Sequence, residues 1–433
     1  MGILKNTLMT LLTSCVLLSL PIQAQQMEEG TEEDKDNWKI MHAGTLLAIP
    51  GEQPIGNATL VIKNDRIDQL LEGFQSLEQL GLDQAEVIDL RDKFVLPGLI
   101  DAHVHLTMDR SLDREQDDSS DKPDESLDVY ALALGVENAR KTVEAGFTTV
   151  RNLGSSGWSI FALRDGVNSG KIVGPRIFAS GHTIRIGSES EGGECYSVDS
   201  CKQAVRRQID MGADVIKIYA TCSGGQLCSR IGSPSPFLAD ELQAVVDTAK
   251  TRELIVAAHA HNVRGINMAL NAGVDSIEHG TLNDSSSRQL FKKYGTYLVP
   301  TLMVLDRIRR INPEREDSMM KTHTQTHIDH HEQNINDAFQ AGIKIAAGSD
   351  AGVVPHGENA RELEFYTIVG MTPMEAIVTA TINSADLLGQ SHNIGSLQVG
   401  KYADIIATDV SPLEDITALK EISFVMASGK KIK

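Results

Sequence analysis

The sequence predicts an α/β protein: a (β/α)8 barrel of the TIM type with a small β-sandwich domain formed from both chain termini. Three observations predict this fold. Eight short runs rich in β-branched residues recur through the middle of the chain, helical periods separate them, and the flanking segments alternate apolar and polar residues. A length of 433 residues with 41% hydrophobic residues allows the large core that such a barrel needs.

The barrel strands are expected at residues 99–105, 148–152, 176–180, 215–219, 254–259, 276–279, 297–301 and 343–349. Segments between them, such as 129–144 and 239–250, carry apolar residues at three- and four-residue spacing, which is typical of helices packed on a sheet. Glycine commonly ends a helix, and such segments are followed by Gly146, Gly212, Gly273 and Gly342. Eight consecutive units of this kind predict a closed barrel.

The flanks of the barrel have a different pattern, that of half-buried strands. The alternating segments are residues 39–49, 58–67 and 87–96 before the barrel, and residues 404–408 and 422–428 after it. We therefore place the small domain in residues 27–96 and 389–433, and the barrel in residues 97–388.

The first 24 residues resemble a secretory signal peptide. Lys5 lies in a short polar start, residues 8–20 are mostly apolar, and a cleavage site is expected after Ala24. Because a mostly apolar stretch of about thirteen residues does not span a bilayer, we expect no integral membrane span and a periplasmic or secreted mature chain. Lipidation at Cys15 is the alternative, although apolar residues continue past this cysteine where lipoprotein signals turn polar.

Export to an oxidising compartment changes how the cysteines are interpreted. Removal of the signal peptide removes Cys15 and leaves four cysteines, an even number that favours disulfides in an oxidising compartment. Three pairings are possible, and we expect the local one because five residues separate the members of each near pair. These pairs are Cys195 with Cys201 and Cys222 with Cys228.

The charge of the chain argues against polyanionic partners. A net charge of −19 disfavours nucleic acids and anionic membrane surfaces. Much of this charge lies in residues 28–36 and 109–128, which we interpret as solvated segments. We expect a homo-oligomer that acts on a small molecule.

Histidines and a carboxylate stand at the expected strand ends. His103 and His105 close the run LPGLIDAHVHL, and an i, i+2 pair on a strand points to one side, so both imidazoles can bind one metal ion. Barrel enzymes carry their active groups at this end of the strands. The same position is occupied by His259, His261, His279 and Asp350. Such convergence predicts a metal site at the barrel mouth.

Lys217 lies within a strand, in the run VIKIY. An unpaired ammonium is expensive to bury in apolar surroundings, so this lysine must be neutralised, paired or modified. Together with LPGLIDAHVHL, AAHAHN, SIEHG and GSDAG, the strand lysine resembles the motif set of the amidohydrolase superfamily, in the same order. The similarity covers nearly all of the mature chain, including the C-terminal IGSLQVGKYADII.

The resemblance implies a binuclear metal site. In that superfamily the matching lysine is carbamylated by carbon dioxide and bridges two divalent metals, usually zinc. One metal would be held by His103, His105 and Asp350, and the second by His259 and His279, with Lys217 joining them. Imidazole nitrogen and carboxylate oxygen are ordinary zinc ligands, so the chemistry of the residues agrees.

The resemblance also implies roles in amide hydrolysis, in which a hydroxide that bridges the metals attacks the carbonyl carbon. Asp350 would carry the proton to the leaving amine. His261 would face the substrate, because the first histidine of this H-x-H coordinates in related enzymes. Tyr219 can contact the substrate carbonyl or carboxylate, or simply pack in the core. His182 and Arg185 can reach the mouth and contact substrate, although a loop hydrogen bond is the favoured explanation for each.

Within the superfamily the sequence resembles metal-dependent dipeptidases and carboxypeptidases of the prolidase type, which cut Xaa-Pro or Xaa-Arg/Lys dipeptides, and ochratoxin-degrading amidases. All of them need an amide carbonyl at the metals and a free carboxylate nearby. One departure is GSESEGGECYS after the third run, where relatives often carry Gly-Gly-His. The alternatives are a one-metal cyclic amide hydrolase of the imidazolonepropionase type and a non-catalytic binding protein derived from the fold.

Residues 322–332 contain histidines at helical spacing, namely His323, His327, His330 and His331. A second metal site there is conceivable, but these histidines have neither a flanking carboxylate geometry nor a strand-end placement. We expect a solvated helix face.

Overall fold

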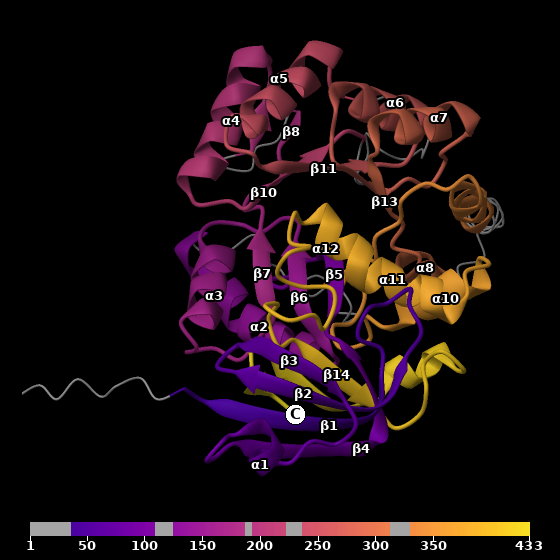
Figure 1. The fold of residues 1–433 in the computed structure, drawn as a ribbon. Coiled ribbons are helices and arrows are strands. Elements are labelled where there is room, and N and C mark those ends of the chain that lie inside the picture. Colours follow the sequence, from indigo (N-terminus) through magenta and orange to yellow (C-terminus); the bar gives the residue numbers. More distant parts are fainter. Residues whose placement is uncertain (1–35, 109–123, 187–192, 222–235, 312–329) are drawn as a thin grey trace, which may run out of the picture. The chain divides into compact units, whose positions relative to one another are not determined.

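A parallel barrel forms the centre of the protein (Figure 1). The structure, a computed structural model, describes residues 36–108, 124–186, 193–221, 236–311 and 330–433. Barrel strands in chain order are β5 (Leu99–Val104), β6 (Phe147–Asn152), β7 (Arg176–Ala179), β10 (Val215–Tyr219), β11 (Ile255–Ala260), β12 (Ser276–His279) and β13 (Tyr297–Val299). They pair in parallel within two sheets, β5-β6-β7 and β10-β11-β12-β13.

Backbone contacts close these two sheets into a ring. On one side Asp214 donates to the carbonyl of Ala179 at 2.8 Å, and Ile184 bridges to Ile218. On the other side the expected eighth strand, residues 343–349, lies between β13 and β5. It makes one isolated parallel bridge, Ile345 with Leu298 of β13, rather than a ladder, and the amide of Ala102 donates to the carbonyl of Ala347 at 2.8 Å. The predicted eight-unit barrel is confirmed.

Helices follow the strands and flank the barrel (Figure 1). Their bounds are α2 (Asp124–Glu144), α3 (Ser159–Asn168), α4 (Val198–Asp210), α5 (Ala239–Lys250), α6 (Val263–Ala272), α7 (Ser285–Tyr294), α8 (Met303–Ile311), α10 (Arg361–Ile368), α11 (Pro373–Val378) and α12 (Ser384–Leu387). Their limits reflect local sequence. The side chain of Asn262 accepts from Gly265 N at the start of α6, and Gly273, with φ 86°, ends it.

Segments from both chain ends build the small domain, as predicted. Its strands are β1 (Trp38–Leu46), β2 (Ile55–Lys63), β3 (Arg66–Glu72), β4 (Glu86–Pro97), β14 (Ile405–Thr408), β15 (Ile422–Ala427) and β16 (Lys430–Lys431), with the short helix α1 (Leu77–Leu80) before β4. One hydrogen-bonded sheet joins them in the order β16-β15-β14-β4-β1-β2-β3. The C-terminal strand β14 runs antiparallel to β4, with Ile405 opposite Pro97, and the sheet has its own apolar core.

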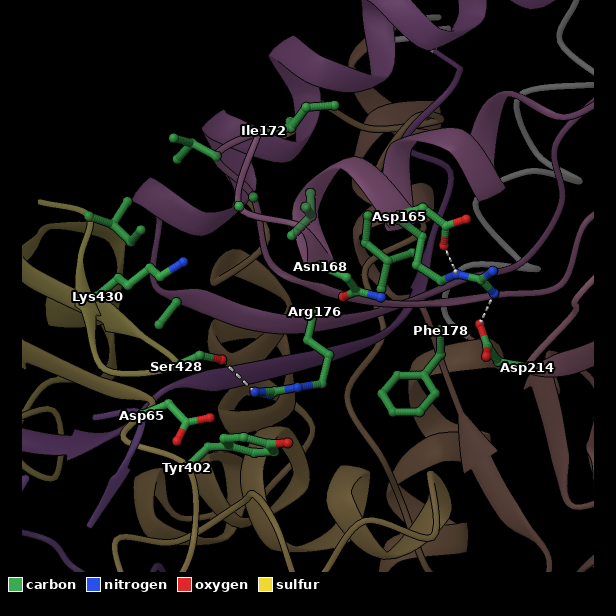
Figure 2. Close-up of a pocket in the computed structure, with 18 of the residues that line it drawn as sticks. Asp65, Asp165, Asn168, Ile172, Arg176, Phe178, Asp214, Tyr402, Ser428 and Lys430 are labelled. Atoms are coloured by element: carbon green, nitrogen blue, oxygen red, sulfur yellow. Dashed lines mark hydrogen bonds and ion pairs between the residues drawn. The ribbon is translucent and has the colours of Figure 1, made fainter. Parts of the chain in front are cut away.

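A cavity of about 810 Å³ lies at the amino-terminal end of β7, beside strands of the small domain (Figure 2). Its central cation, Arg176, donates to Asp404 and Ser428 at 2.7 Å each and stacks on the ring of Tyr402. Another lining cation, Arg164, pairs with Asp214 at 2.8 Å. The expected catalytic groups lie at the carboxyl-terminal strand ends, so this cavity is separate from them.

The expected local disulfide between Cys195 and Cys201 is present. It joins β9 (Glu194–Cys195) to α4, and β9 pairs with β8 (Arg185–Ile186). Several sequence predictions lie outside the described residues: the signal peptide with Cys15, the second pair Cys222 and Cys228, and the histidines His323 and His327. Among the residues that the structure does describe, no helix has the length and apolar character of a membrane span.

Candidate active site

Three predicted ligands from opposite ends of the barrel sequence meet at its mouth. His103 lies on β5, His105 directly follows it, and Asp350 follows the eighth barrel segment. The Oδ1 atom of Asp350 lies 3.2 Å from Nε2 of His105 and 3.6 Å from Nε2 of His103. All three side chains are buried, and each can offer one atom to a common metal ion.

A second group of imidazoles lies beside the first. His259 on β11 and His279 on β12 have ring centroids 4.6 Å apart, and His261 stacks on His279 at 4.9 Å. One nitrogen from each of the three lies within 4.8 Å of the others. The rings of His103 and His279 are 5.2 Å apart, so the two groups form one continuous cluster.

Lys217 on β10 is 1% exposed, and its Nζ has no hydrogen-bond partner among the described residues. Burial lowers the pKa of this ammonium to about 8, although Glu278 and Asp350 oppose the change. Its charge acts on His103 and His279, one residue from each imidazole group. A buried amine without a hydrogen-bond partner among the described residues, beside two groups of imidazoles, fits a side chain that is chemically modified and then binds metal.

The imidazoles are oriented through their Nδ1 atoms, which leaves Nε2 as the remaining ligand atom. The contacts of Nδ1 are His103 to Glu278 Oε2 at 2.8 Å, His105 to Gly154 O at 3.3 Å, His261 to Thr281 Oγ1 at 2.8 Å and His279 to Thr301 Oγ1 at 2.6 Å. Burial lowers the pKa of His103 and of His261 to about 4. Both rings are therefore neutral near pH 7, the form that binds metals.

Backbone strain is present at the same strand ends. His279, Thr301 and Asp350 have φ values of 67°, 53° and 59°, in the left-handed region that residues with a Cβ rarely adopt. Asp350 is held there because its amide donates to the carbonyl of His103 at 2.8 Å. Strain of this kind persists where the surrounding structure fixes it, and it is common at functional sites.

Three buried charged residues of the site were not identified from the sequence. Arg151 on β6 and Glu278 on β12 are both fully buried and form an ion pair at 2.9 Å. A third, Asp101, accepts from the amides of His103 and Ser349 at 3.0 Å each, which ties β5 to the eighth segment. Each is a charged residue inside a β-branched run. The test that singled out the strand lysine would also have found them.

Two of the residues predicted to contact substrate lie next to each other. The half-buried ring of Tyr219 is 4.8 Å from that of His259, and the guanidinium of Arg185 lies 5.6 Å from the Tyr219 ring centroid. Tyr219 and Arg185 therefore form one wall beside the imidazoles. His182 is held locally, since its amide donates to Gln208 Oε1 at 2.8 Å.

The expectation of a solvated histidine helix is wrong in one respect. His330 is exposed, but His331 is 1% exposed, and its Nε2 lies 2.9 Å from the carbonyl oxygen of His279. The next turn of this helix supports the same segment, because Asn334 donates to the carbonyl of Thr281 at 2.9 Å. His331 thus braces the site and does not form a surface patch.

Comparisons with known proteins agree with this architecture. The model of the amidohydrolase family matches residues 94–432. Ochratoxinase from Aspergillus niger is 32% identical over 92% of this chain and 88% of its own length. A crystal structure of a Xaa-Pro dipeptidase with bound methionine in the active site is 34% identical, with a TM-score of 0.82 over 91% of this chain and 99% of that one. An imidazolonepropionase from Fusobacterium nucleatum is 23% identical over 82% of this chain and 85% of its own length.

Proposed function

The chain belongs to the amidohydrolase family, and from this premise we propose that it is an exported binuclear zinc hydrolase. It acts on amide bonds, as its similarity to ochratoxinase and to a dipeptidase supports. The proposed substrate is a dipeptide or an N-acyl amino acid. In both, the scissile amide lies next to a C-terminal amino acid with a free carboxylate.

The observation that carries the proposal is the buried Nζ of Lys217, which has no hydrogen-bond partner among the described residues. Reaction of a neutral amine with carbon dioxide forms a nitrogen–carbon bond and releases one proton, which turns a costly cation into a carbamate anion. Two oxygens of that anion can each serve a metal ion. We assign one metal to His103, His105 and Asp350 and the other to His259 and His279, with Lys217 between them.

Bound metal ions would supply a Lewis acid for the carbonyl oxygen and lower the pKa of a water molecule. The residues of the chain do the rest. The carboxylate of Asp350 would take up a proton and pass it to the leaving amine. The carbonyl and the free carboxylate of the substrate are received by His261, Tyr219 and Arg185. The guanidinium of Arg185 lies in the wall beside His259 and carries the positive charge that attracts the carboxylate.

The experiment that tests the proposal is hydrolysis of a dipeptide library and an N-acyl amino acid library by purified mature protein. We expect cleavage in at least one library. The hydrolysis rate should fall by about 100-fold or more after chelation and recover when Zn²⁺ is added. Metal analysis should give two ions per chain. One ion per chain, with cleavage only of cyclic amides, would favour the imidazolonepropionase-like alternative. If zinc-loaded protein cleaves neither library, the peptidase and amidase assignment is wrong.

Export is a further part of the proposal. The disulfide between Cys195 and Cys201 supports it, because such bonds persist in oxidising compartments. We expect residues 1–24 to be absent from the mature protein, so that its mass corresponds to a chain starting at Gln25. Mass spectrometry of protein from the periplasm or medium measures this, and an intact N-terminus there would contradict signal cleavage after Ala24.

A further inference from the structure

A fully buried ion pair crosses the interior of the barrel. Arg151 comes from β6 and Glu278 from β12, strands that are not neighbours, and Nη2 of the arginine lies 2.9 Å from Oε1 of the glutamate. Ser276 shares the inward face of β12 with Glu278, and its hydroxyl accepts from Nη1 of Arg151 at 3.0 Å. Replacing such a pair by apolar residues of similar volume is often neutral or stabilising, so stability alone does not explain it.

The two oxygens of the Glu278 carboxylate have different partners. Oε1 receives Arg151 and the hydroxyl of Ser276, while Oε2 lies 2.8 Å from Nδ1 of His103. Arg151 is fixed in turn, because its Nε donates to the carbonyl of Ala102 at 2.6 Å, the residue directly before His103. The pair therefore contacts both the ring of His103 and the strand that carries it.

His103 differs from the other oriented imidazoles of the site. In the contacts that the structure describes, the Nδ1 atoms of His105, His261 and His279 face neutral oxygens, whereas that of His103 faces a carboxylate. A carboxylate fixes the tautomer with the proton on Nδ1, and it makes Nε2 a stronger donor toward a cation.

We propose that Glu278, held in place by Arg151, is a positioning residue that presents Nε2 of His103 to a metal ion. This inference rests on the proposed function, in which His103 is a ligand. Glu278 itself binds neither metal nor substrate. Its effect should fall mainly on the metal held by His103, His105 and Asp350.

The test is metal affinity, measured in variants that separate positioning from folding. Glu278→Gln alone leaves Arg151 buried without a counter-charge, which destabilises the barrel. The informative variant is therefore the double substitution Arg151→Met with Glu278→Gln, which removes both charges. We expect its thermal unfolding midpoint to stay near that of the wild type. Its affinity for one of two Zn²⁺ ions, measured by chelator competition, should fall by about 10- to 100-fold.

A matched control is available at the amino-terminal end of β7. Arg176 and Asp404 form an ion pair at 2.7 Å, and the double variant Arg176→Met with Asp404→Asn removes it. That variant should bind both ions as the wild type does. If the Arg151 and Glu278 double variant also binds both ions with wild-type affinity, the positioning role is wrong and the proposed function stands. A wild-type protein that takes up no metal overturns the proposed function, and this inference with it.

Discussion

Lys217→Ala is expected to lower kcat/KM by at least about 10³-fold and to leave the protein short of metal. The side chain is 1% exposed, and its amine has no hydrogen-bond partner among the described residues. In the proposed site it becomes the anion that joins two metal ions. Without it the imidazole groups must hold two cations with less negative charge, so affinity falls together with catalysis. Steady-state kinetics and metal content of the same preparation measure both effects.

Two comparisons make this result specific. Lys250→Ala, on the exposed side of α5, removes a hydrogen bond to the carbonyl of Gly273 and should leave kcat/KM unchanged. Added formate or acetate should restore part of the activity of Lys217→Ala, because a small carboxylate can occupy the space and charge of the missing carbamate. A Lys217→Ala protein that folds and retains wild-type activity and metal content would contradict the bridging role.

The sequence was sufficient to predict the barrel because parallel strands buried on both faces appear as continuous apolar runs, and glycines ended the helices between them. The eighth unit was the exception. Residues 343–349 make a single isolated bridge, because the amide of Ala347 donates to the carbonyl of Thr379, in the π-helical turn Thr379–Asn383, at 3.1 Å rather than to a strand. A single sequence does not reveal such competition from a distant segment.

The cluster at the mouth could be anticipated because imidazoles at strand ends are chemically unusual and the barrel topology gathers them. The contacts among its supporting residues could not be anticipated. Arg151 and Glu278 are 127 positions apart, and nothing in one sequence pairs them. The case of His331 is similar, because helical spacing indicated a solvated face and burial came from a tertiary contact with the carbonyl of His279.

Asp350→Asn separates the two roles given to this residue, those of ligand and of proton carrier. Burial alone would raise the pKa of Asp350, but the neighbouring His103 and His105 hold it below its ordinary value. The carboxylate is therefore charged at neutral pH and able to accept a proton. An amide oxygen can still coordinate a metal but cannot carry a proton. We expect kcat per bound metal ion to fall by about 10²- to 10⁴-fold, the range for loss of general acid–base catalysis.

The control for Asp350→Asn is Asp386→Asn, on a partly exposed residue that accepts from Tyr297 and Lys344 outside the mouth. It should alter neither kcat nor metal content. The decisive quantity is the ratio of kcat to metal content, because a residue that acts only as a ligand lowers both in proportion. If Asp350→Asn retains the wild-type kcat for each bound metal ion, the proton must travel by another group. His261, an imidazole of the cluster that we do not assign as a ligand, is then the next residue to test.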